Sequence, residues 1–211
     1  KELERRLGSV LTQGFDDCAT IYGRFKLLDS FEGLLERPII QDELEKKHIA
    51  LVQAYGADLK QVQELFLTER ESPPIPNNFP PIAGALTWCR GLKERIQEPM
   101  AKLKQLNKTI MQREEAKEVV KVYSTIMSSL DDYEHQKIEE WGTDVEKSSQ
   151  AKLRLPLLAR QSPTTPNGTG LLRVNFDPAL VRLLREVKYF LLLKLDVPSS
   201  ALDIYRKAET Y

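Results

Sequence analysis

A proline-rich segment divides the chain and limits what can surround it. Residues 72–81 read SPPIPNNFPP, and five of these ten residues are proline. Proline has no backbone N–H and its ring fixes φ, so neither a helix nor a strand can run through the segment. The sequence therefore predicts an ordered or extended connector that delivers the chain into a new helix.

The residues before the connector are predicted to be helical. Apolar residues recur at three- and four-residue spacing over residues 1–36, and Pro38 is expected to end that segment. Each glycine inside it weakens a helix by about 1 kcal/mol against alanine, so we expect a break near Asp29–Gly33. A second amphipathic helix is predicted from about Gln41 to Arg70.

Two further helical stretches are predicted after the connector. One begins near Ile82, and Pro99 is expected to kink or restart it. The next runs from about Met100 to Thr143, and its apolar residues keep 4-3-4-3 spacing between Val119 and Tyr133. That spacing suits antiparallel packing in a helical bundle.

The pattern changes near the C-terminal end. Two short apolar strands joined by the loop Gln161–Gly170 predict a β-hairpin, with Pro156 confining the first strand to an edge. Asp177 and Pro178 form a helix start, and Pro198–Ser199 is expected to end that helix, with Ser199 or Ser200 capping another. The predicted buried face of the first of these helices consists of Leu180, Leu183, Leu184, Val187 and Leu191.

The predicted fold class is mainly α. It consists of successive antiparallel helical bundles with proline-rich breaks and one small β-hairpin at about residues 153–176. The predicted divisions are residues 1–71 (half of a bundle), 72–81 (connector), 82–149 (long helices), 150–177 (hairpin) and 178–211 (helices of the next bundle). We expect the chain to be a piece of a longer one.

Charge and composition disfavour several classes of function. The chain has 211 residues with 31 basic and 31 acidic side chains, so its net charge is zero, although residues 152–211 are basic and residues 1–71 acidic. A chain that coats nucleic acid or an anionic membrane is usually basic, so neither is expected as a partner. Two cysteines are too few for a disulfide scaffold. No apolar run approaches the roughly 18 residues that span a bilayer.

The sequence contains no recognisable catalytic or cofactor constellation. Cys18 and Cys89 lie in apolar stripes, where free cysteine acts as a small hydrophobe, and the two histidines are scattered. The turn at Asn167–Gly170 is not followed by the Gly-Lys-Ser/Thr of a phosphate loop. We therefore predict no catalytic residue, no bound metal, no cofactor and no direct nucleotide binding.

Partner binding is better supported by the residues. Tryptophan is enriched in interface hot spots, which makes Trp141 a candidate anchor, whereas Trp88 is expected to fill a gap between helices. A basic docking surface is predicted on one helix stripe, and the alternative is an ordinary solvated face. The residues of this predicted surface are Arg173, Arg182, Arg185, Lys188 and Tyr189.

Two stretches of the sequence are specific enough to indicate a family. They are Ser72–Met100, with Pro-Pro-Ile-Ala-Gly before a tryptophan-bearing helix, and Leu171–Leu192, with Val-Asn-Phe-Asp-Pro before Leu-Leu-Arg-Glu-Val. Both resemble the N-terminal tail region of dynein heavy chains, most closely axonemal outer-arm chains. The shorter segments Leu35–Ile40 and Tyr55–Phe66 agree with this resemblance.

The resemblance implies a function and a set of partners. The expected role is a non-catalytic tail segment of an ATP-driven microtubule motor for ciliary beating, which acts as a structural scaffold for heavy-chain association, for binding of intermediate and light chains and for attachment of the motor. The implied location is the cytoplasm or cytoskeleton, in the axoneme of a cilium or flagellum. Other dynein heavy chains, intermediate and light chains, and axonemal docking factors are the implied partners. The alternatives are the tail of a cytoplasmic or inner-arm dynein, a free-standing adaptor of spectrin type, and, least favoured, a helical enzyme.

Overall fold

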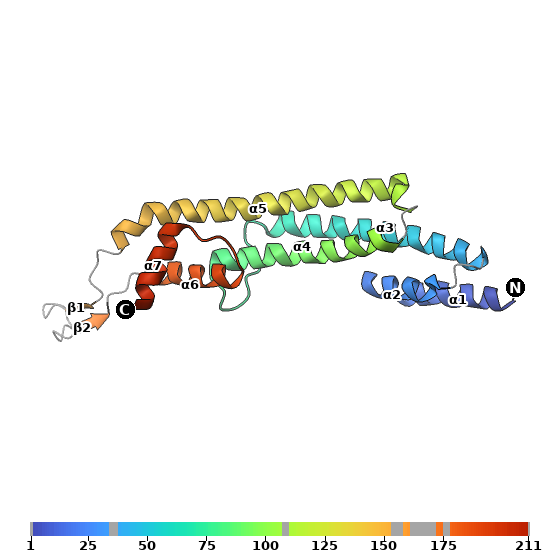
Figure 1. Ribbon diagram of the computed structural model, residues 1–211, viewed down its shortest axis with the longest axis horizontal. Coiled ribbons are helices and arrows are strands. Elements are labelled where there is room, and N and C mark those ends of the chain that lie inside the picture. Colours follow the sequence, from blue (N-terminus) through green and yellow to red (C-terminus); the bar gives the residue numbers. More distant parts are fainter. Residues whose placement is uncertain are drawn as a thin grey trace. The chain divides into compact units, whose positions relative to one another are not determined.

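The computed structural model describes residues 2–33, 38–106, 110–152, 158–160, 172–174 and 178–210 (Figure 1). Long helices make up most of this part of the chain, so the predicted mainly helical class is confirmed. The helices are α1 (Glu2–Asp17), α2 (Ile21–Glu32), α3 (Pro38–Glu69), α4 (Pro81–Leu106), α5 (Glu114–Lys152), α6 (Pro178–Leu192) and α7 (Ser199–Thr210). A short 3₁₀ turn, η1 (Ile110–Gln112), precedes α5.

The chain forms two compact units. The first contains Lys1–Ser72 and Arg90–Asp131, and the second contains Pro73–Cys89 and Asp132–Tyr211. Helices α4 and α5 each contribute residues to both units.

The first unit is built on α3, against which α1 and α2 pack. Its core contains the apolar stripe predicted for α3, including Leu44, Leu51 and Tyr55. The hydroxyl of Tyr55 is fully buried and donates a 2.7 Å hydrogen bond to the carbonyl of Ile96 in α4. That bond matters because an unpaired buried hydroxyl or carbonyl is costly.

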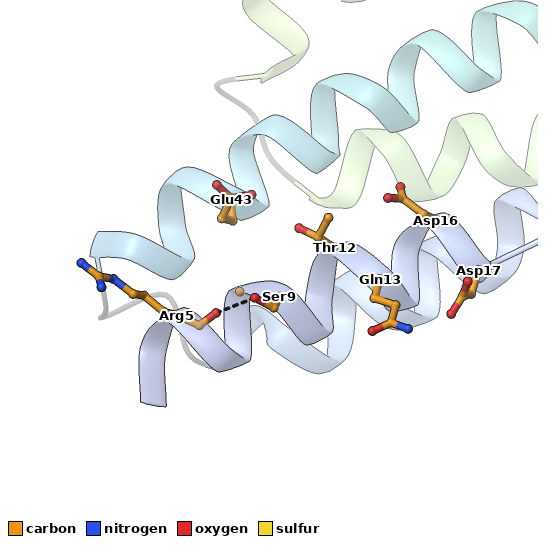
Figure 2. A pocket seen from close by; sticks show the side chains of 8 residues that line it. Arg5, Ser9, Thr12, Gln13, Asp16, Asp17 and Glu43 are labelled. Carbon is orange, nitrogen blue, oxygen red and sulfur yellow. Dashed lines mark hydrogen bonds between the residues drawn. The ribbon is translucent and has the colours of Figure 1, made fainter. Parts of the chain in front are cut away.

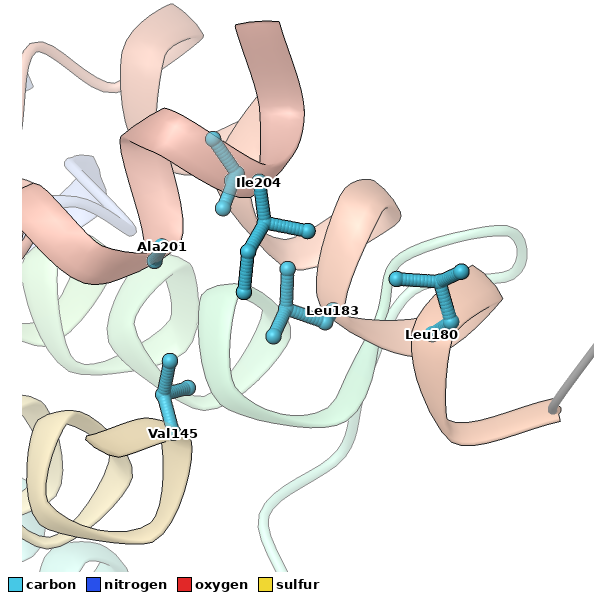
Figure 3. Close-up of a cluster of buried hydrophobic side chains, with 6 residues drawn as sticks. Val145, Leu180, Leu183, Ala201 and Ile204 are labelled. Carbon is cyan, nitrogen blue, oxygen red and sulfur yellow. The ribbon is translucent and has the colours of Figure 1, made fainter. Parts of the chain in front are cut away.

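The second unit has its own apolar cluster, drawn in Figure 3. Leu180, Leu183 and Val187 of α6 meet residues from α5 and α7. The other members of the cluster are Val145, Ala201 and Ile204. Most of the buried face predicted for α6 is thus confirmed, but Leu191 is 46% exposed, and Phe190 and Glu186 are buried instead.

The first predicted helical segment contains two breaks. The predicted break near Asp29–Gly33 is confirmed, because α2 ends at Glu32 and is capped by Gly33. A further break at residues 18–20 was not predicted, and there the Thr20 hydroxyl accepts a 3.1 Å bond from the Gly23 N–H and starts α2. Helix α2 ends before Pro38, and Pro38 itself begins α3, three residues before the predicted start at about Gln41, since proline is well suited to a first helical position. Pro99 lies inside α4, so the helix does not restart there, and a kink at Pro99 stays a prediction.

Other helix ends lie at different residues than predicted. Residues 100–106 belong to α4, and the following helix starts at Glu114 and continues to Lys152, beyond the predicted end at Thr143. Helix α6 ends at Leu192, before Pro198, because Lys194 adopts φ 55° and the Leu195 N–H donates a 2.9 Å bond to the Phe190 carbonyl. This is the Schellman arrangement that closes a helix.

Part of the predicted hairpin region lies outside the described residues. Two three-residue strands, β1 (Leu158–Arg160) and β2 (Leu172–Val174), pair antiparallel, with Leu158 opposite Val174 and Arg160 opposite Leu172. Residues 153–157, 161–171 and 175–177, which include Pro156, the loop and the predicted cap Asp177, are not among the described residues. The full hairpin over about 153–176 therefore stays a prediction.

Candidate functional site

The structure divides the predicted partner-binding residues into two groups. Arg182 and Lys188 are exposed on α6. Arg185 is also exposed, but it and the half-buried Tyr189 form hydrogen bonds within the second unit. Arg173 lies in β2, and its side chain is not among those described.

Arg185 and Tyr189 converge on one atom of the connector. The Arg185 Nη2 donates a 3.0 Å bond, and the Tyr189 hydroxyl a 3.2 Å bond, to the carbonyl oxygen of Asn78. The Tyr189 ring also contacts the Phe79 ring, with 4.7 Å between the centroids. Two of the residues predicted to bind a partner therefore attach α6 to the proline-rich connector.

The connector presents that carbonyl because it makes a tight turn. The Phe79 N–H donates a 3.1 Å bond to the Pro76 carbonyl, and Asn78 has φ 75°. A positive φ at the third position is a feature of type II turns, and asparagine tolerates it better than most residues.

Glu186 is the third contact between α6 and the connector region, and sequence analysis did not identify it. Its side chain is buried, and its two carboxylate oxygens accept bonds of 2.8 Å and 2.9 Å from the N–H groups of Ile82 and Ala83. These are the second and third residues of α4, whose N–H groups have no partner inside the helix. Glu186 thus acts as a helix cap supplied by another helix.

The electrostatics of Glu186 reflect competing effects. Burial raises the pKa of its carboxyl above the ordinary value of 4.5, while the bonds from Ile82 and Ala83 and the nearby charge of Arg185 act to lower that pKa. Burial is the largest of these influences.

A signal for this cap was present in the sequence. The residue before α4 is Pro80, which has no side-chain oxygen to accept a bond from the first turn. A helix that begins with Pro-Pro and then Ile-Ala needs an acceptor from elsewhere. Glu186 is the only acidic residue of α6, and it lies on the buried side of that helix.

Each residue of the Pro-Pro-Ile-Ala-Gly motif has a structural role. Pro81 occupies the first helical position, where its missing N–H costs nothing. The Gly84 N–H donates a 2.8 Å bond to the Pro80 carbonyl. Ile75 of the connector lies directly over Gly84, so that a Cβ at position 84 would overlap Ile75 Cγ2 and lie 3.3 Å from its Cβ.

Trp141 is engaged in packing within the second unit. Its ring stacks on that of Phe190 of α6, with 4.5 Å between the centroids and 13° between the planes, and it lies against the apolar cluster of Figure 3. Trp88 is half-buried and meets Tyr133 edge-on at 6.2 Å. The role of Trp141 as an interface anchor stays a prediction, while its stacking already explains an aromatic residue at this position.

We call Arg185, Glu186 and Tyr189 together the α6 clamp. These three residues lie within five positions of one helix and hold the connector turn and the first turn of α4, about a hundred residues earlier in the sequence. All the contacts of the clamp lie inside the second unit.

A separate groove of about 730 Å³ lies on the first unit, between α1 and α3 (Figure 2). Most of the residues that line it are polar or charged, and Figure 2 shows the Ser9 hydroxyl donating to the Arg5 carbonyl, a 3.1 Å bond. Two of its carboxylates are paired with lysines, Asp16 with Lys47 and Glu43 with Lys46. The groove therefore offers little unbalanced charge for a ligand.

Within the described ranges, no group of three or more His, Cys, Asp or Glu side chains is placed to hold a metal ion. Over the same part of the chain, none of the helices combines the length and the apolar character needed to cross a membrane.

Comparison with known proteins identifies the family. The model of "Dynein heavy chain, N-terminal region 1" matches residues 1–211. The chain belongs to the dynein heavy chains. The predicted resemblance is thereby confirmed.

The dynein relatives are flagellar, ciliary and axonemal chains. The chain is 42% identical to the dynein beta chain of the flagellar outer arm of Chlamydomonas reinhardtii and 36% identical to the ciliary dynein beta chain of Tripneustes gratilla, over 100% and 99% of its length. It is 33% identical to dynein axonemal heavy chain 9 of Homo sapiens over 90% of its length. These names agree with the predicted location in the axoneme of a cilium or flagellum.

The dynein chain spans about 5% of the length of the first two relatives. Within that span, the two stretches that indicated the family, Ser72–Met100 and Leu171–Leu192, contact one another through the α6 clamp. Two of the motifs that indicated the family, Pro-Pro-Ile-Ala-Gly and Leu-Leu-Arg-Glu-Val, thus meet at one junction.

Proposed function

We propose that this chain is a non-catalytic structural segment in the tail of an axonemal outer-arm dynein heavy chain. The match of the N-terminal region model over residues 1–211 is the observation that carries the proposal. The motor's ATP-driven activity then belongs to other parts of the heavy chain. The proposed role requires no bound cofactor or nucleotide in this segment.

The α6 clamp supports a mechanical role. A tail must pass force from the motor to an anchor, and densely packed helices are weakly compressible. A proline-rich connector is a point where the chain has no helical bonds of its own. By binding the Asn78 carbonyl and the first N–H groups of α4, the clamp makes this break a defined junction.

The proposed partners are other dynein heavy chains, intermediate and light chains, and axonemal docking factors. Arg182 and Lys188 remain the residues most suited to contact one of them, because they are exposed and lie outside the clamp. A role for Arg185 in partner binding would have to coexist with its bond to Asn78.

The proposal is tested by disabling the clamp in the full-length heavy chain. Glu186→Ala together with Tyr189→Phe should lower the amount of heavy chain and intermediate chain recovered in assembled outer arms. The microtubule-stimulated ATPase per assembled motor should stay unchanged. A matched control is Glu139→Ala, an exposed carboxylate of α5 in the same unit.

The opposite pattern would contradict a structural role. If the clamp variant assembles into arms in full amount but each motor hydrolyses ATP several-fold more slowly, the segment participates in the motor's chemistry. The Glu139→Ala heavy chain should match the unmodified chain in both measurements.

A further inference from the structure

Helix α6 has apolar side chains on two opposite sides. Its inner side, formed by Leu180, Leu183, Val187 and Phe190, is buried in the second unit. On the other side, Val181 is 43% exposed and Leu192 67%, while Leu191, which is 46% exposed, borders the inner side. A surface helix of a monomer normally has one apolar stripe and a polar opposite face, so this second set requires an explanation.

The outward side chains follow the spacing of a helix-packing seam. Val181, Leu184, Lys188 and Leu191 are separated by three, four and three residues, and Leu192 lies beside the last of them. This spacing brings side chains onto one stripe that can pack against a second helix. Leu184 is half-buried at the border with the apolar cluster, so the stripe continues from the core to the surface.

The charges on this face are all of one sign. Arg182, Arg185 and Lys188 are exposed, whereas Glu186, the one acidic residue of α6, is buried against the start of α4. We define the outer α6 face as Val181, Lys188, Leu191 and Leu192, flanked by Arg182 and Arg185. It is an apolar stripe with basic edges.

We propose that the outer α6 face is the docking surface for an acidic amphipathic helix of another protein in the dynein arm. An apolar stripe on such a helix would cover Val181, Leu191 and Leu192, and its carboxylates would pair with Arg182 and Lys188. This inference rests on the proposed tail function and names the chemistry of one partner. Charge complementarity distinguishes an acidic helix from a neutral or basic one.

The first test is photo-crosslinking in the native assembly. A photo-reactive phenylalanine analogue replaces Leu192 in the full-length heavy chain, and assembled arms are irradiated and analysed by mass spectrometry. The expected adduct maps to a helical segment of a different protein that has net negative charge and apolar residues at three- and four-residue spacing. The matched control carries the analogue at Leu67, which is 57% exposed on α3.

Charge reversal then tests the basic edges. Arg182→Glu with Lys188→Glu should reduce the adduct at position 192 at least tenfold, because two attractive contacts become repulsive. Arg185 is left unchanged, since its loss would also break the bond to Asn78. Lys60→Glu, an exposed lysine of α3, serves as the control and should leave the yield at position 192 unchanged.

Several results would overturn the docking inference. They are the absence of an adduct at position 192 in arms that contain the heavy chain, an adduct to a second copy or to another part of the same heavy chain, and an adduct to a segment without acidic character. None of these results contradicts the proposed tail function. That function is tested separately, by the assembly and ATPase measurements on the clamp variant.

Discussion

At the scale of single residues, Glu186 is a buried charged group of the second unit whose contacts make specific predictions. A carboxylate that is 4% exposed is tolerated there because two backbone N–H groups bind it. The chain's two tryptophans, Trp88 and Trp141, both lie in this unit, so tryptophan fluorescence reports on the surroundings of side chains of this unit.

Removing the Glu186 carboxylate should destabilise the second unit. Glu186→Ala leaves the N–H groups of Ile82 and Ala83 without acceptors and is expected to lower the free energy of unfolding by about 2 kcal/mol. Urea titration followed by tryptophan fluorescence measures this change, and amide hydrogen exchange at Ile82 and Ala83 should become faster. An unchanged exchange rate at both amides would show that the cap contributes nothing.

The same carboxyl predicts a pH dependence. Because burial raises the folded-state pKa of Glu186 above 4.5, the folded unit binds the proton more tightly than the unfolded chain does. This contribution to stability is fully present below pH 4.5 and is lost as the pH rises through the folded-state pKa. The free energy of unfolding of the native chain, minus that of Glu186→Gln, should therefore fall as the pH rises above 4.5. If this difference in free energy rises with pH instead, the bonds from the Ile82 and Ala83 N–H groups lower the pKa of Glu186 more than burial raises it.

Lys194 provides a stabilising substitution. It has φ 55°, a left-handed conformation that costs a residue with a Cβ about 1–2 kcal/mol and costs glycine little. Lys194→Gly should raise the free energy of unfolding of the second unit by about 1 kcal/mol, measured by urea titration. Lys188→Gly, inside α6, should instead lower that free energy by about 1 kcal/mol.

At the scale of elements, the connector is positioned by the helix that follows it. Ile75 lies over the backbone of α4 at Gly84, where only a hydrogen atom fits. The turn at Asn78, the α6 clamp and this contact together connect the proline-rich segment to two helices.

Adding a methyl group at position 84 should disturb that contact. Gly84→Ala would force Ile75 away from α4, and overpacking of this kind costs about 1–3 kcal/mol. Ile75→Ala in the same chain should restore most of the loss, because the overlapping Cγ2 is then absent. The free energy of unfolding of each variant is measured by urea titration followed by tryptophan fluorescence. If Gly84→Ala lowers this free energy equally with and without Ile75→Ala, the proposed contact is refuted.

At the scale of the whole molecule, the net charge of zero conceals a basic C-terminal part. Residues 152–211 contain 10 basic and 5 acidic side chains, and the exposed Lys188 and Lys194 belong to this part. A tail segment that binds another subunit through it should bring these amines close to that subunit's surface.

Lysine crosslinking of native arms tests this expectation. Lys188 and Lys194, with Lys152 and Lys207 nearby in sequence, should form crosslinks to other dynein subunits. Addition of about 0.5 M salt before crosslinking should reduce the yield if the contact is electrostatic, because charges in solution are screened over a few ångströms at that ionic strength. If these lysines react readily but link only within this chain, the basic part is a solvated surface.

The sequence by itself determined the helical class, the position of the connector and the family. These depend on local chemistry: apolar residues at helical spacing, proline without an N–H, and a motif read in order along the chain. The exposed positions of Arg182 and Lys188 also followed from helix periodicity.

Only the tertiary structure decided what Arg185, Glu186 and Tyr189 do. Their partners lie about a hundred residues away, and periodicity places a side chain on a face without saying which atom it meets. The end of α6 at Leu192 was missed because Lys194 adopts a left-handed conformation that closes the helix, and lysine has no preference that would announce it. Glu186 is buried because α4 begins without an acceptor of its own, a requirement that is met only when the two segments are folded together.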